Sequence, residues 1–146
     1  MNSRRWFNQS QPQTLQIAVF LLYADAVLGL LRLNDQRSIY QYTFGSLFRS
    51  MDGQTIVRVG NLFWLLIVIG SALAAYGIAN EMKLAYRAGI VIAAAPLVAR
   101  VVIMFYGYPR HIGLLDLDLI GLLFEVALVT LLVHPQSREY ERLWFK

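Results

Sequence analysis

One apolar stretch, residues 113–133 (GLLDLDLIGLLFEVALVTLLV), limits what this chain can fold into. Its 21 residues suffice to cross a membrane, since about 20 helical residues span the hydrocarbon core. The stretch also carries three carboxylates, Asp116, Asp118 and Glu125. A charge at the bilayer centre costs about 3 kcal/mol even on lenient insertion scales. The stretch therefore predicts a transmembrane helix whose carboxylates need compensating groups, and Arg100 is the basic residue well inside another apolar span.

The composition supports a membrane protein with a single domain. Hydrophobic residues make up 58% of the 146 residues, and the mean hydropathy is +0.50. Soluble domains are closer to half apolar. We expect an all-α, four-helix transmembrane bundle with up-down-up-down topology, which occupies residues 1–146 and leaves no room for a separate soluble catalytic domain. The predicted spans are residues 15–33, 62–79, 84–106 and 113–133.

Two further segments have a predicted place at the membrane surface. Residues 38–52, in the first outer loop, carry apolar side chains at helical spacing and are too short to span, which predicts an amphipathic helix at the interface. A lid or docking surface over the outer end of the bundle is the alternative. Residues 135–146 follow Pro135 and alternate aromatic with basic residues, which is typical of an interfacial tail.

Small residues and one proline indicate how the predicted spans pack. Gly70 and Ala74, and Gly89 and Ala93, are four residues apart, a spacing that allows helix backbones to approach closely in lipid. We expect these faces to pack inside the monomer, with a subunit contact as the alternative. Pro96 lacks a backbone N–H and predicts a kink in the third span.

The distribution of basic residues predicts the orientation. Four spans place both termini on one side, where seven basic residues fall, against five on the other side, which has the longer loop. The seven are Arg4, Arg5, Lys83, Arg87, Arg138, Arg142 and Lys146. The positive-inside rule then predicts a multi-pass protein of the cytoplasmic (inner) membrane with both termini in the cytoplasm.

The ionisable residues inside the spans form the candidate site. Counted from the outer span ends at 1.5 Å per residue, Asp118 lies about 7.5 Å deep, Arg100 about 9 Å, Asp25 about 12 Å and Glu125 about 18 Å. Asp116 points away from Asp118 and fits a helix start, where the helix dipole favours a carboxylate. The depth match predicts an Arg100–Asp118 ion pair and leaves Glu125 without a visible partner.

Three interpretations of this cluster remain open. It is a structural ion pair with hydrogen-bonded carboxylates, a substrate, ion or proton site, or a set of groups that pairs with another subunit. Three carboxylates and one guanidinium cannot all stay charged and dry, so we expect a carboxylate to be protonated, to bind a cation or to reach water. Arg110 and His111, beside the fourth span, are candidate contacts for a lipid head group.

Several function classes are excluded or disfavoured by residue content. The chain has no cysteine, which excludes disulfides and thiolate metal sites. His111 and His134 would lie about 34 Å apart on one helix, so a single subunit cannot place both on one metal or haem. No metal and no cofactor are expected. The net charge of +4 is spread over span ends without a long basic run, which disfavours nucleic acid as a partner.

Three functions are compatible with these features. The first is a non-catalytic subunit or assembly component of a membrane complex, whose partners are lipids and either further copies or other membrane subunits. The second is a small oligomeric transporter or channel that uses Asp25, Arg100, Asp118 and Glu125. The third is a lipid- or quinone-binding membrane protein. No nucleophile, acid and base stand at usable spacing, which favours a protein that is not an enzyme.

Overall fold

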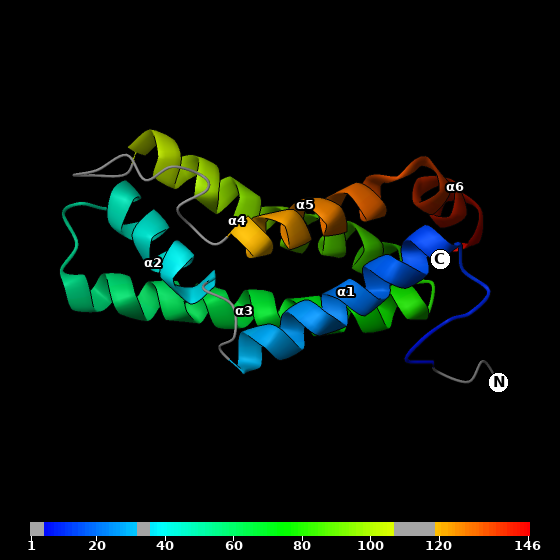
Figure 1. Cartoon of the computed structure of the whole chain (residues 1–146). Helices are drawn as coiled ribbons and strands as arrows, with labels where there is room; N and C mark the ends of the chain where they lie inside the picture. Colours follow the sequence, from blue (N-terminus) through cyan, green and yellow to red (C-terminus); the bar gives the residue numbers. More distant parts are fainter. Residues whose placement is uncertain (1–4, 32–35, 107–118) are drawn as a thin grey trace.

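The computed structural model describes residues 5–31, 36–106 and 119–146, and all regular structure in these ranges is helical (Figure 1). The predicted fold class, all-α, is therefore confirmed for the described residues. They form six helices: α1 (Gln13–Leu30), α2 (Gln36–Leu47), α3 (Gly53–Ala79), α4 (Lys83–Tyr106), α5 (Leu119–Val133) and α6 (Pro135–Trp144).

Four of the helices close a ring around the core. In the described residues, α1 contacts α3 and α5, and α4 also contacts both α3 and α5. The two longest helices, α3 and α4, run the length of the molecule, with α1 and α5 beside one half and α2 beside the other (Figure 1). The centre of the molecule is therefore the level at which α1, α2 and α5 come together on the α3–α4 pair.

Three to four of these helices are long and apolar enough to cross a membrane. In the described part of the chain, α1, α3 and α4 each qualify, and α5 with α6 qualifies as a pair bent by 47°. Pro135 stands at the first position of α6, where its missing N–H is tolerated, and so marks the bend. Residues 113–118 of the predicted fourth span lie outside the described residues.

Helix α3 begins before the predicted second span. Helix α3 starts at Gly53 rather than at residue 62, because the Asp52 carboxylate caps it by accepting a hydrogen bond from the Thr55 backbone N–H at 2.9 Å. The added turns pack against α2, where Gly60 lies against the backbone of Gln41. The other bounds differ less: α1 covers 13–30 rather than 15–33, and α4 covers 83–106 rather than 84–106.

Helix α2 falls within the loop predicted to hold an amphipathic helix, and it is an integral part of the packing. Its residues Ile39, Tyr40 and Thr43 are buried. The Thr43 hydroxyl donates to the carbonyls of Ile39, at 2.8 Å, and of Ala99 in α4, at 3.3 Å. A side chain of α2 thus reaches the backbone of α4, which fixes how the two helices meet.

The small residues of α3 and α4 pack inside the monomer, as predicted. Ala74 and Ala93 are buried in the main core with Leu22 of α1. A Cβ on Gly89 would meet Ile78 and Ala74, and one on Gly70 would meet Ile92. Close helix approach is therefore used within the chain, where it also allows polar groups on neighbouring helices to meet.

Both ends of the described chain are bound to the turn between α3 and α4. The amide of Asn80 donates to the Arg5 carbonyl at 2.8 Å, and the Arg5 N–H donates back to the Asn80 side-chain oxygen at 3.0 Å. Glu81 accepts from Asn8, at 3.1 Å, and from Tyr140, at 3.0 Å. We call this set the terminal clasp, which comprises Arg5, Asn8, Asn80, Glu81, Tyr140 and Lys146.

Candidate functional site

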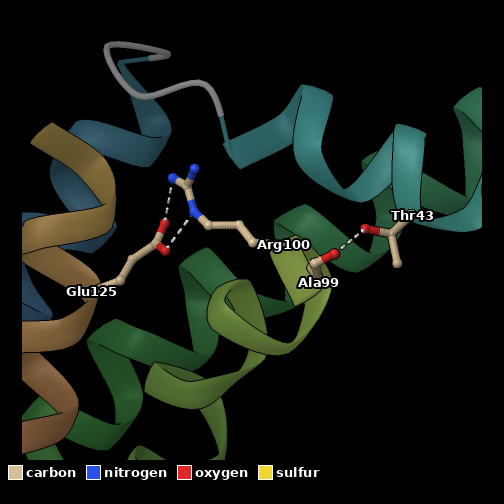
Figure 2. Close-up of polar contacts among 4 residues, drawn as sticks. All are labelled: Thr43, Ala99, Arg100 and Glu125. Carbon is tan, nitrogen blue, oxygen red and sulfur yellow. Dashed lines mark hydrogen bonds and ion pairs between the residues drawn. The ribbon is translucent and has the colours of Figure 1, made fainter. Parts of the chain in front are cut away.

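Arg100 of α4 and Glu125 of α5 form a two-point ion pair in the interior (Figure 2). The guanidinium Nε donates to Oε2 of Glu125 at 2.8 Å, and Nη2 donates to Oε1 at 3.1 Å. The two side chains are 1% and 3% exposed. A planar guanidinium matches a carboxylate in this arrangement, which adds geometric specificity to the charge attraction. The pair therefore fixes the register of α4 against α5.

This pairing differs from the depth-based prediction. Glu125 was expected near the midplane without a partner because its depth was counted from residue 113. The structure instead brings Glu125 of α5 to Arg100 of α4 through the two hydrogen bonds given above. Asp116 and Asp118, the predicted partner of Arg100, lie outside the described residues.

Asp25 of α1 is buried with a polar neighbour on α3. The Ser71 hydroxyl donates to Oδ2 of Asp25 at 2.9 Å, and the two residues are 5% and 0% exposed. A buried carboxylate needs such donors, because leaving it without them costs far more than the bond itself contributes. This contact was not predicted from the sequence, because a serine in an apolar helix is common.

Tyr40 of α2 brings a hydroxyl to the same charged groups. Burial raises the pKa of Tyr40, the charges of Asp25 and Glu125 raise it further, and Arg100 opposes them. Its ring packs edge-on against Phe63, with centroids 5.1 Å apart. Its hydroxyl is buried and has no hydrogen-bond partner among the described residues. In the sequence Tyr40 looked like one apolar position on an interfacial helix.

Five helices thus each contribute one polar side chain to one layer of the bundle. We call it the charged layer, and it comprises Asp25, Tyr40, Ser71, Arg100 and Glu125. The layer can therefore hold the helices in register, and the Tyr40 hydroxyl, which has no hydrogen-bond partner among the described residues, can bind a hydrogen-bonding guest.

The other predicted site residues are placed only in part. Pro96 is buried within α4, which continues as a helix on both sides of it. Arg110 and His111, the predicted head-group contacts, lie outside the described residues. In the described ranges, no three His, Cys, Asp or Glu side chains are grouped so that they could hold a metal ion.

No family of known proteins, no curated protein and no solved structure matches this chain. The helices and the charged layer define a class. The chain is an all-helical protein whose long apolar helices indicate a place in a membrane, with a buried ion pair at the junction of its helices.

Proposed function

We propose that the protein is a small multi-pass membrane protein that acts as a non-catalytic subunit or assembly component of a membrane complex. The observation that carries the proposal is the Arg100–Glu125 pair. Its two hydrogen bonds fix the register of α4 against α5, so the buried charges serve the packing of these helices. A buried ion pair is weak evidence for stability, and in some proteins such a pair specifies how helices pack. The terminal clasp supports the same role, because it holds both ends of the described chain against one turn and gives partners a fixed surface.

A second candidate is a small oligomeric transporter or channel. Its support is the Tyr40 hydroxyl, which is buried beside Asp25 and Glu125 without a hydrogen-bond partner among the described residues. Ionisable groups inside membrane helices often mark proton or ion pathways. Four helices rarely enclose a pathway alone, so this function requires a homo-oligomer.

Proton flux and partner purification separate the two candidates. Purified protein is reconstituted alone into liposomes that contain a pH-sensitive dye, and wild type is compared with Glu125→Gln and Arg100→Gln. The control is Glu139→Gln, which makes the same change at an exposed position of α6. The subunit proposal expects equal proton leak from all four proteins and a stoichiometric membrane partner after mild purification. The subunit proposal is overturned if wild type and the control show proton flux and the two variants do not.

We also propose that the protein lies in the inner membrane with both termini in the cytoplasm. Lys83, Arg87, Arg138 and Arg142 lie near the clasp end, which supports a cytoplasmic location for both termini in the inner membrane. Because the chain has no cysteine, labelling of a single introduced cysteine shows on which side of the membrane that residue lies, without background labelling. An impermeant maleimide applied from outside is expected to label Ser50→Cys and to spare Gln9→Cys. The reverse labelling overturns the orientation.

A further inference from the structure

An apolar groove of about 460 Å³ lies between α2 and α4. Along α2 it extends from Tyr40 to Leu47, and along α4 from Ile90 to Val102, with Phe63 of α3 at its base. Two of its α4 residues, Val91 and Val98, are 70% and 59% exposed. Because α4 is long and apolar enough to cross a membrane, this groove opens toward lipid rather than toward the core.

The chemistry of the walls favours a hydrocarbon chain as the occupant. Thr43 lines the groove, but its hydroxyl already donates to the carbonyls of Ile39 and Ala99. The other lining residues are alanines, branched aliphatics and aromatics. A peptide backbone placed there would leave its own polar groups unpaired, which is costly in an apolar site.

The length of the groove argues against a membrane-spanning partner helix. From Ile90 to Val102 the groove follows α4 for about 18 Å at 1.5 Å per residue. One leaflet of the hydrocarbon core is about 15 Å thick, and the whole core about 30 Å. The groove therefore matches the depth of one acyl chain, whereas a spanning helix needs a face about twice as long.

A cation stands at the end of the groove where a lipid head group would lie. Arg49 is exposed two residues beyond Leu47, and its Nη2 donates to the carbonyl of Tyr106, the last residue of α4, at 3.2 Å. We propose that the groove between α2 and α4 binds one acyl chain of an anionic phospholipid, whose phosphate interacts with Arg49. The site borders the charged layer at Tyr40, and the proposal holds for either candidate function.

Lipid retention by the purified full-length protein tests this site. The protein is equilibrated in detergent with phosphatidylglycerol or with phosphatidylcholine, and bound lipid is counted by native mass spectrometry. Val98→Trp fills the groove and is expected to reduce retained phosphatidylglycerol about tenfold, since two lost methylene contacts already amount to that factor. Val101→Trp, the same change at an exposed position of α4 outside the groove, is expected to retain it.

The head-group contact is tested by a second pair of variants that leaves the groove intact. Arg49→Gln is expected to weaken the binding of phosphatidylglycerol about threefold, as for an exposed ion contact, without changing the binding of phosphatidylcholine. Arg49→Lys is expected to keep the preference for phosphatidylglycerol. Equal retention by Val98→Trp and Val101→Trp overturns the proposal. The proposal is also overturned if the purified wild type is a dimer without bound lipid and Val98→Trp dissociates it, because a second copy of the chain would then fill the groove. If Val98→Trp does not fold, equal lipid preference in Arg49→Gln and Arg49→Lys overturns it instead.

Discussion

Arg100 and Glu125 meet at two points, with Nε–Oε2 and Nη2–Oε1 distances of 2.8 and 3.1 Å, although 25 residues separate them in the sequence. Removing one partner leaves the other as a buried charge, so Glu125→Leu and Arg100→Met are each expected to destabilise the fold by about 3–5 kcal/mol. The double variant is expected to be far less destabilised than the sum, because no charge of the pair is then stranded. Unfolding in mixed detergent micelles measures all three, and additive losses would show that the pair is not coupled.

Gly60 provides a test of how α2 docks on α3. An added Cβ would lie 3.0 Å from the backbone N and Cα of Gln41, and backbone atoms cannot move aside as a side-chain end can. Gly60→Ala is therefore expected to cost about 1–3 kcal/mol, as overpacking does. Gly45→Ala is the matched control, because its nearest neighbour, Ile56, is at an ordinary 3.7 Å. The same free energy of unfolding for both variants would contradict a tight α2–α3 contact.

The cap of α3 has a predictable pH dependence. Hydrogen bonds from Thr55 hold the pKa of the Asp52 carboxyl below its ordinary value. Because the folded pKa is the lower one, the stabilisation is complete above the unfolded pKa of about 3.9 and is lost as the pH falls through the folded value. Amide exchange at Thr55, corrected for the intrinsic rate, is expected to accelerate in that acidic window.

The control for the cap is Asp52→Asn, which can still accept the hydrogen bond but does not titrate in this range. Its Thr55 exchange is expected to show no acidic transition. A wild-type profile as flat as that of the variant would mean that the Asp52 charge does not contribute to the cap.

The terminal clasp predicts protection of the first arginine that the structure describes. Asn80 exchanges two hydrogen bonds with the backbone of Arg5, at 3.0 and 2.8 Å. Asn80→Ala removes both, and tryptic cleavage after Arg5 is expected to accelerate at least about fivefold, since two bonds of roughly 0.5–1.5 kcal/mol each amount to about 1–3 kcal/mol. Asn61→Ala, which breaks side-chain bonds to Arg37 and Gln41 instead, is expected to leave this cleavage unchanged. Equal acceleration in both variants would assign the effect to general loosening.

Hydropathy predicted most of the helices because long runs of apolar residues stand out when hydropathy is averaged along the sequence. It missed residues 53–61 of α3, since Gln54, Arg58 and Asn61 lower the local hydropathy. The signal for that start was Asp52, because aspartate is one of the residues favoured at a helix N-cap. Sequence patterns therefore located the long elements and underestimated a helix whose first turns pack on protein.

The sequence predicted the charged residues of the candidate site but not the residues that contribute hydroxyl groups. Asp25, Arg100 and Glu125 are conspicuous in apolar runs, and the structure buries all three. Their pairing was not predicted, because residue counts give depth along a helix but not which faces of α4 and α5 meet. Tyr40 and Ser71 are common in apolar helices, so nothing in the sequence separates a polar contact from packing at either residue.

The order of Arg100 and Glu125 along the chain has a consequence for biogenesis. In a chain that enters the membrane as it is made, Arg100 is polymerised 25 residues before Glu125. At about 5–20 residues per second, this leaves the guanidinium without that carboxylate for roughly 1–5 s. The arrival of α5 is therefore the event that completes the Arg100–Glu125 pair and sets the register of α4 against α5.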